Sequence, residues 1–166
     1  MTTISLRPYL PTDAEPLAEL FRASIEELSS DDYDEAQRTA WAERADDEEE
    51  FGKGLASMLT LIAMLEGEIV GFVSLKDKDS IDMLYVHPDA ARMGVATSLV
   101  DALEKLATAR GASELKADAS ETASPFFTQR GYASISRNTI LIGDEWLANT
   151  TMSKKLSGPA APKALQ

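Results

Sequence analysis

The sequence contains no cysteine and only one histidine among its 166 residues. Without cysteine the chain forms neither a disulfide nor a thiolate metal site, and a single imidazole is too few for the usual histidine-rich zinc sites. We therefore expect a protein that binds no metal. The absence of cysteine gives no indication of the redox compartment.

Long apolar runs and an excess of positive charge are also missing. The N-terminus, MTTISLRPYL, has neither the basic start nor the apolar core of a signal peptide. No apolar run approaches the roughly 18–20 residues that a membrane span needs. We therefore expect a cytoplasmic protein without a membrane partner. The formal net charge of -12 argues against nucleic acid as a partner, because binding to it requires a basic surface.

The acidity is concentrated in one segment. Residues 26–50 hold 12 acidic and two basic residues, which leaves 16 acidic and 14 basic residues elsewhere. The rest of the chain is therefore close to neutral, and an anionic ligand is compatible with it.

One stretch, residues 81–103, carries the strongest pattern in the chain. It begins as a strand, in which Ile81, Met83 and Tyr85 alternate with their neighbours up to Pro88. A turn over residues 87–93 follows. Helical spacing then begins, with apolar residues at Val95, Leu99, Ala102, Leu103 and Leu106 and a stop at Gly111.

The residues at the start of this helix are small. Gly94 and Ala96 would let a ligand approach backbone N–H groups that have no helical partner, where the helix dipole adds partial positive charge. The pattern predicts a phosphate site. An alternative is an ordinary strand-turn-helix unit in which the glycine only eases close packing.

Two segments resemble a known family. The patterns G-x-G-x-x-G and G-x-x-x-x-G-K-[ST] are absent. Instead Leu-Tyr-Val-His-Pro, followed by RMGVAT at 92–97, resembles the acetyl-CoA-binding signature [QR]-x-x-G-x-[GA] of the GNAT superfamily of N-acetyltransferases. Ala91 stands at the first signature position, with Arg92 beside it. The segment SETASPFFTQRGY at 120–132 resembles the family's N-x-x-A-x-x-[FL]-Y-x-x-x-G-F.

The remaining patterns predict the other elements of one domain. We expect a strand at 3–9, a helix from a capping box at Thr12–Glu15 to about Leu28, a short helix at 34–43, and a helix from about Asp46 with Phe51, Leu55 and Met58 buried. Further expectations are hairpin strands at 59–65 and 68–76, a strand at 112–117, a helix at 121–130, and strands at 132–142 and 146–156. Residues 157–166 are expected to form a disordered tail.

The fold class expected from this order is α/β, with a mixed sheet and helices on both faces over residues 1–156. The order also resembles the GNAT fold. That resemblance implies six to seven mostly antiparallel strands with a splayed central pair.

The resemblance further implies acetyl-CoA as cosubstrate, with its pantetheine lying between the splayed strands. It implies backbone contacts from Leu84, Tyr85 and Val86. The pyrophosphate would lie on the amides of Arg92, Met93, Gly94, Val95, Ala96 and Thr97, and Ser120 and Phe127 would complete the site. Ser120 is explained equally well as a helix N-cap.

A carboxylate is needed as proton acceptor, because direct attack on a thioester requires a neutral amine. Asp82 is our candidate, since an isolated carboxylate in a central strand is costly to bury unless it is paired or functional. The alternative is an ion pair with a lysine such as Lys76. Glu26 and Glu27 would approach the acceptor side by resemblance, or else belong to a solvated helix face.

The general acid is where the chain departs from the family. Phe127 stands where the family often has a tyrosine that protonates the leaving thiolate. Tyr85 or Tyr132 could replace it, although either could equally be a core tyrosine. His87 is expected to be a loop residue, because it directly precedes Pro88. A serine hydrolase that would use this imidazole is not supported, since the chain has no G-x-S-x-G motif. Trp41 and Phe51 could line the acceptor pocket or simply lie in the core.

The function that these features predict is an N-acetyltransferase that moves an acetyl group from acetyl-CoA to a primary amine by direct transfer. Since the acidic segment would flank the acceptor side, we expect a cationic small-molecule or peptide acceptor. The alternative is a non-catalytic acyl-CoA-binding or interaction module of the same fold, which the phenylalanine at position 127 favours. A monomer or a homodimer is expected.

Overall fold

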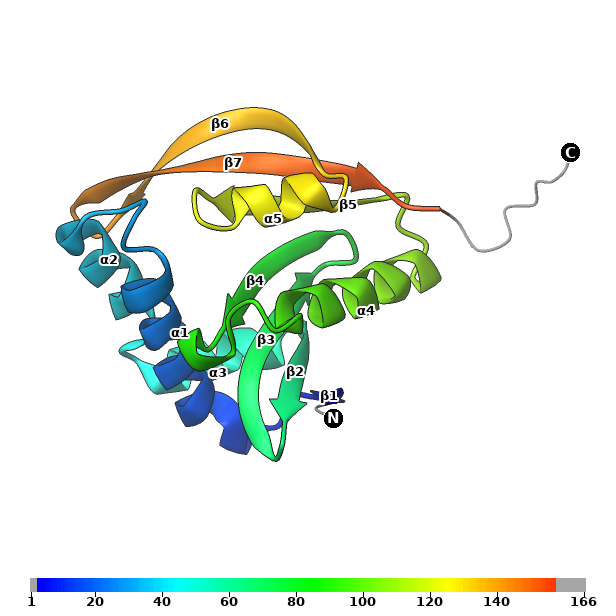
Figure 1. The fold of residues 1–166 in the computed structure, drawn as a ribbon, viewed down its shortest axis with the longest axis horizontal. Helices are drawn as coiled ribbons and strands as arrows, with labels where there is room; N and C mark the ends of the chain where they lie inside the picture. The colour runs from blue at the N-terminus through cyan, green and yellow to red at the C-terminus, as the bar shows by residue number, and fades with distance from the viewer. Residues whose placement is uncertain (1–2, 158–166) are drawn as a thin grey trace, which may run out of the picture.

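The computed structural model describes residues 3–157, which form one seven-stranded sheet in the order β1-β2-β3-β4-β5-β7-β6 (Figure 1). The strands are β1 (Ile4–Pro8), β2 (Leu59–Leu65), β3 (Glu68–Lys76), β4 (Ser80–Val86), β5 (Glu114–Ser120), β6 (Ala133–Ile142) and β7 (Glu145–Lys155). Of the strand pairs in this part of the chain, β4–β5 is parallel and the others are antiparallel. The expected fold class, a mixed sheet of mostly antiparallel strands, is confirmed.

Helices cover both faces of the sheet. The helices are α1 (Ala14–Leu28), α2 (Glu35–Ala42), α3 (Glu48–Ala56), α4 (Val95–Ala109) and α5 (Ser124–Gln129), with 3-10 turns at Pro11–Asp13, Glu43–Ala45 and Pro88–Ala90. Phe72 of β3 packs in a core with α1 and α3, and the next residue, Val73, packs in a second core with α4. The central strand is therefore buried on both faces, as its almost wholly apolar sequence indicates.

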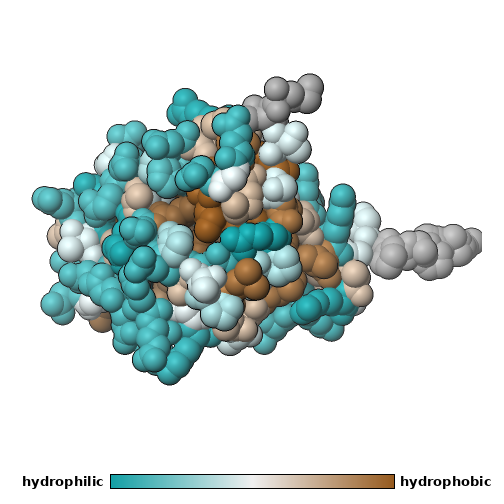
Figure 2. Space-filling view, turned by 90° about the horizontal axis from the view of Figure 1, so that it is seen from below, coloured by the Kyte–Doolittle hydropathy of each residue, from teal (hydrophilic) through white to brown (hydrophobic). Residues whose placement is uncertain are grey.

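The core and the surface follow the sequence pattern with one exception. Phe51 and Leu55 of α3 are buried as expected, whereas Met58 follows the end of the helix at Ala56 and is only half-buried. The surface is mostly hydrophilic, and apolar side chains gather near the middle of the face seen from below (Figure 2).

The capping box expected at Thr12–Glu15 is wrong. The neighbouring Asp13 is held instead: its carboxylate accepts hydrogen bonds from the Arg7 guanidinium at 2.8 and 2.9 Å and from the Leu10 amide at 2.8 Å. These bonds lower the pKa of Asp13, with the Arg7 hydrogen bond as the largest cause. Because Pro11–Asp13 forms a 3-10 turn around this carboxylate, α1 begins only at Ala14.

The boundary between β5 and α5 also differs from expectation. The strand was expected at 112–117 and runs over Glu114–Ser120, because it pairs with β7 as far as Ser120 opposite Asn149. The helix expected at 121–130 is confined to Ser124–Gln129, since residues 121–123 form a turn. Tertiary strand pairing therefore overrides the local pattern here.

The two central strands separate soon after they meet. Strands β4 and β5 pair only at Ser80 opposite Lys116 and Ile81 opposite Ala117. On its other edge β4 pairs with β3, and that register passes from Met83 directly to Ile81, so that Asp82 is an extra, bulged residue. A bulge bends its strand. The bulge at Asp82 therefore accounts for the separation of β4 from β5, which the resemblance to the GNAT fold implies.

Close packing of α4 on the sheet requires a glycine at position 71 of β3. A Cβ there would lie 2.7 Å from Val95 Cγ1 and 3.1 Å from the Tyr85 carbonyl oxygen. We expect Gly71→Ala to lower the free energy of unfolding by about 1–3 kcal/mol, the usual cost of overpacking. The control is Gly54→Ala in α3, where an added Cβ meets nothing within 4 Å.

Urea denaturation of both variants checks this prediction. Gly54→Ala should raise the free energy of unfolding by about 0.5–1 kcal/mol, because alanine is the better helix former. A Gly71→Ala protein as stable as the unmodified chain would contradict the close approach of α4 to β3.

Candidate functional site

A pocket of about 360 Å³ lies where β4 turns away from β5. Its walls come from five places: the end of α1, α2 at Trp41, the last residues of β4, the turn into α4 with the first turn of that helix, and the segment from the end of β5 into α5. The lining residues are Ser24, Ile25, Leu28, Ser29, Trp41, Leu84, Tyr85, Val86, Ala90, Ala91, Arg92, Gly94, Val95, Ala96, Thr97, Ser120, Thr122, Ala123 and Phe126.

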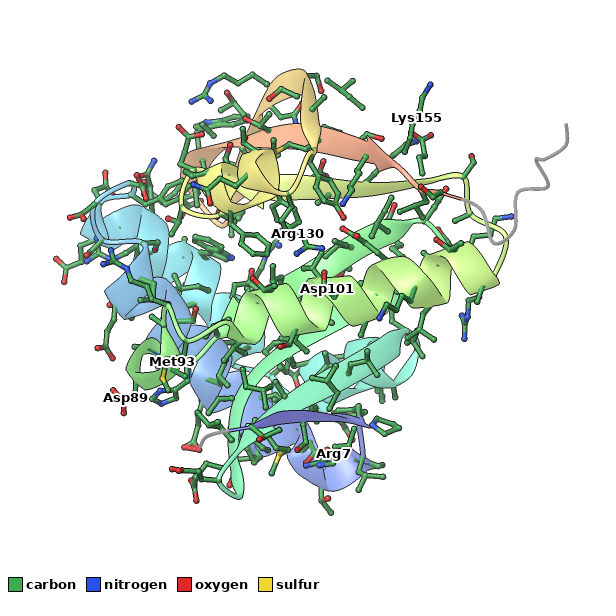
Figure 3. All side chains as sticks on the ribbon, turned by 45° about the vertical axis from the view of Figure 1, so that its right-hand side comes forward. Arg7, Asp89, Met93, Asp101, Arg130 and Lys155 are labelled. Atoms are coloured by element: carbon green, nitrogen blue, oxygen red, sulfur yellow. The ribbon has the colours of Figure 1, made fainter. Side chains whose placement is uncertain are left out.

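Most of the residues predicted to hold the cofactor meet in this pocket. They are Leu84, Tyr85, Val86, Arg92, Gly94, Val95, Ala96, Thr97 and Ser120. Met93 does not line it and is 48% exposed on the turn before α4 (Figure 3). Phe127 is buried and packs edge-on against Phe126 and Tyr132.

The first turn of α4 presents free backbone N–H groups to the pocket. Its N-cap is Gly94 with φ +86°, a conformation that favours glycine, and no side chain caps the helix. The first turn contains no acidic residue. Uncapped amides and the positive end of the helix dipole suit an anion such as a phosphate.

A second, smaller cavity of about 70 Å³ adjoins the pocket between β4 and β5. The two share five lining residues, which are Trp41, Leu84, Tyr85, Ser120 and Ala123. The smaller cavity is also lined by Asp82, Asp118 and Phe127. Two cavities therefore meet at the splay of the sheet, where two reactants could approach each other from different sides.

Tyr85 is one of the residues that line both cavities, and its hydroxyl is hydrogen-bonded to another of them, Trp41. The hydroxyl accepts this hydrogen bond from Trp41 Nε1 at 3.2 Å, and the ring of Tyr85 packs against Phe21 and Phe72 with centroid distances of 4.6 and 5.7 Å. Burial raises the pKa of Tyr85 to about 12. The phenol is therefore protonated at neutral pH, as an ordinary tyrosine is, and burial makes it a weaker acid than an exposed one.

The comparisons with known proteins agree with this geometry. Residues 29–156 match the family described as the acetyltransferase (GNAT) domain. The chain belongs to the GNAT acetyltransferases. An uncharacterized N-acetyltransferase of Escherichia coli K12, YafP, is 34% identical over 155 residues, which are 93% of this chain and 98% of that protein.

Solved structures share the fold. The crystal structure of a GCN5-related N-acetyltransferase from Rhodopseudomonas palustris has 59% sequence identity and a TM-score of 0.92, over 93% of this chain and 96% of its own. The PaiA N-acetyltransferase from Thermoplasma acidophilum, solved with coenzyme A, has 19% identity and a TM-score of 0.77, over 92% and 99% of the two chains. Among residues 3–157 of this N-acetyltransferase, no helix is long and apolar enough to cross a membrane.

The prediction that Asp82 is a buried carboxylate in a central strand is wrong. The side chain of Asp82 is exposed rather than buried, because this residue is the bulged one of β4. The alternative also fails, since no ion pair joins it to Lys76 in the described part of the chain. Its carboxylate nevertheless lines the smaller cavity beside Tyr85.

Tyr132 lies outside both cavities, which argues against the catalytic role predicted for it. It is 3% exposed, and its hydroxyl donates to Glu104 Oε2 of α4 at 2.8 Å. Burial, and then this hydrogen bond, raise its pKa. Glu104 also pairs with Lys154 and with Arg130, which reaches Asp101 of α4 (Figure 3). Tyr132 therefore belongs to a network that ties α4 to the end of α5 and to β7.

The acidic residues expected from α1 point elsewhere. Glu26 and Glu27 are exposed and do not line the pocket, whose wall on this helix consists of the neighbouring Ser24, Ile25, Leu28 and Ser29. The approach of the two glutamates to the acceptor side is therefore not supported. They form the solvated face that the sequence left open.

The structure also places four further residues that the sequence singled out. His87 is a loop residue, as expected, and its Nδ1 accepts from the Asp89 amide at 3.0 Å. Ser120 Oγ accepts from the Ala123 amide at 3.1 Å, so that it caps a turn and not the helix itself. Trp41 lines both cavities, whereas Phe51 is a core residue.

Hydrogen bonds that the sequence did not predict join the loop after α1 to distant segments of the chain. The Tyr33 hydroxyl donates to the Ala148 carbonyl at 2.6 Å and accepts from the Glu121 amide at 2.9 Å. Asp32 accepts from the Thr122 hydroxyl at 2.8 Å. The loop between α1 and α2 is thereby joined to the turn after β5 and to β7. The sequence carries no local signal for contacts over such separations.

Proposed function

We propose that this N-acetyltransferase binds acetyl-CoA in the larger pocket and transfers the acetyl group to a primary amine that enters through the smaller one. The observation that carries the proposal is the continuity of the pocket from the end of β4 to the uncapped start of α4. Beyond Ile81, β4 has no paired neighbour on the β5 side. Its free backbone groups can therefore bond the amides of a pantetheine arm, as another strand would.

The first turn of α4 would hold the pyrophosphate through the amides of residues 92–97. Relatives with the same fold were solved with the cofactor: the Thermoplasma protein with coenzyme A, and a putative acetyltransferase, YncA, from Salmonella typhimurium with acetyl-CoA. These structures support the assignment of the larger pocket to the cofactor.

The chemistry we propose is direct transfer. The neutral amine nitrogen attacks the thioester carbonyl carbon, and a β4 amide stabilises the oxyanion, an effect of about 10²–10³ in rate. The C–S bond then breaks and the thiolate takes a proton from the Tyr85 hydroxyl. The new amide loses its extra proton to Asp82, directly or through a water molecule. The proton on Asp82 leaves to solvent, and the tyrosinate regains one from solvent.

The acceptor we propose is cationic. Asp82 and Asp118 both line the smaller cavity, and so does Trp41, which belongs to the acidic segment of residues 26–50. Asp118 is held in place by the Thr151 hydroxyl at 2.6 Å. Two carboxylates at the entrance would favour an amine that carries a second positive charge.

A pair of matched amines tests this proposal. We expect kcat/KM for 1,4-diaminobutane to exceed that for 4-amino-1-butanol about tenfold at low salt, because the two differ in one cationic group. The ratio should fall as salt is raised from about 20 to 300 mM, since salt screens exposed charges. Equal kcat/KM values that do not respond to salt would contradict a cationic acceptor.

A non-catalytic acyl-CoA-binding module is the second candidate. The observation that favours it is Phe127, which places no hydroxyl at the position where the family often has its acid. It predicts acetyl-CoA binding without acetylation of any amine in a broad panel, whereas our proposal predicts turnover.

A further inference from the structure

The hydrogen bond between Trp41 and Tyr85 constrains where the Tyr85 proton points. An indole N–H is a donor only. The Tyr85 oxygen must therefore accept from Trp41 Nε1, and its own proton has to be directed elsewhere. Within residues 3–157 the structure shows no hydrogen bond donated by this hydroxyl. The proton is left for a group inside the cavities that Tyr85 lines.

Trp41 is itself held by contacts from the opposite side of the splay. Its ring packs edge-on against Tyr33 at a centroid distance of 5.4 Å, and the Tyr33 hydroxyl is fixed by Ala148 and Glu121. On the same helix, Gln37 Nε2 donates to the Trp146 carbonyl at 2.8 Å. The indole is therefore attached to β7 and the turn after β5, while Tyr85 belongs to β4.

We propose that Trp41 is a positioning residue, which directs the Tyr85 proton toward the leaving sulfur. This inference rests on the proposed function, in which Tyr85 is the acid. Trp41 would not touch the thioester. Its N–H would stabilise the negative charge that appears on the Tyr85 oxygen as the proton leaves, so that it assists the transition state more than the ground state.

The principal test replaces Trp41 with phenylalanine, which keeps a ring and removes the donor. We expect kcat to fall about tenfold, a typical effect of one hydrogen bond to a developing charge, while KM for acetyl-CoA changes by less than about twofold. The control is Trp146→Phe, because Trp146 is 60% exposed and lines neither cavity. The control variant should keep the kcat of the unmodified protein.

A double-mutant cycle separates positioning from simple packing. If Trp41 acts through Tyr85, then Trp41→Phe should have no effect on kcat in a Tyr85→Phe background. Losses that simply multiply in the double variant would overturn the proposal, as would an unchanged kcat in the single one.

A second route covers the case in which Trp41→Phe does not fold. The chain has two tryptophans, so that Trp146→Phe leaves Trp41 as the only one. Biosynthetic replacement of tryptophan by 3-benzothienylalanine then exchanges the N–H for a sulfur in a ring of almost the same shape. The same tenfold loss in kcat is expected, and full activity would overturn the proposal.

Failure of this inference can be distinguished from failure of the proposed function. A protein that turns over acetyl-CoA with normal kcat in both Trp41 variants retains the function and loses the inference. If no amine is acetylated by the unmodified protein, the proposed function fails first. In that case Tyr85→Phe in the Trp146→Phe background should still shift the Trp41 fluorescence, because the indole loses its acceptor.

Discussion

Replacing Tyr85 with phenylalanine is expected to lower kcat about 100-fold or more, with KM for acetyl-CoA changed by less than about threefold. Tyr85 lines both cavities, and its hydroxyl is protonated at neutral pH. Removing it leaves the thiolate to depart unprotonated. The measurement is the rate of thiol release with a saturating amine, together with the mass of the acetylated product.

Tyr132→Phe is the matched control for this prediction. It also removes one tyrosine hydroxyl, but from the Glu104 network outside the cavities. We expect kcat within about twofold of the unmodified protein and a stability loss of about 1–2 kcal/mol, because the half-buried Glu104 loses a partner. Similar losses of kcat in the two variants, or a larger one in Tyr132→Phe, would contradict the assignment of Tyr85 as the acid.

Thr97→Glu is expected to weaken the binding of CoA at least about 100-fold without destabilising the protein. Thr97 is exposed, lines the pocket and is the third residue of α4. A carboxylate in the first turn of a helix is favourable by about 0.3–1 kcal/mol in the absence of other anions. The same charge beside a bound pyrophosphate would repel it.

Thr97→Gln has the same size without the charge and is the control for this variant. Calorimetric titration should give a Kd for CoA within about fivefold of the unmodified protein in Thr97→Gln, since one hydroxyl contact is worth about 1 kcal/mol. If both variants bind CoA equally well, the phosphates do not lie at the start of α4. A glycine-94 variant would be less informative, because φ is +86° there and any other residue is strained.

The cofactor side of the site could be predicted from the sequence because its signal is local. The strand up to Val86, the glycine at 94 and the small residue at 96 follow one another in a single stretch, and the structure brings them together in one pocket. A helix start needs no distant partner to be recognised. The central position of β3 is local in the same sense, since its residues buried on the two faces are almost all apolar.

The catalytic side could be predicted only in part: the sequence singles out Asp82 and Tyr85, but not the surroundings that tertiary contacts give them. A bulge in β4 exposes Asp82, and the alternation of the strand gives no sign of it. Tyr132 finds its acceptor on α4, 28 positions away in the chain, and Trp41 meets Tyr85 across 44. The same holds for Asp13, whose ion pair with Arg7 shifts the start of α1 away from the expected capping box.

The most direct test of the central claim is a thermal melt with and without acetyl-CoA, which requires no knowledge of the acceptor. At about 100 times its Kd the cofactor adds roughly 2.7 kcal/mol, and each kcal/mol raises Tm by about 2–4 °C at this size. We predict a rise of about 5–10 °C in the unmodified protein and none in Thr97→Glu. An unchanged Tm at millimolar acetyl-CoA would contradict the claim that the pocket between β4 and α4 is the cofactor site.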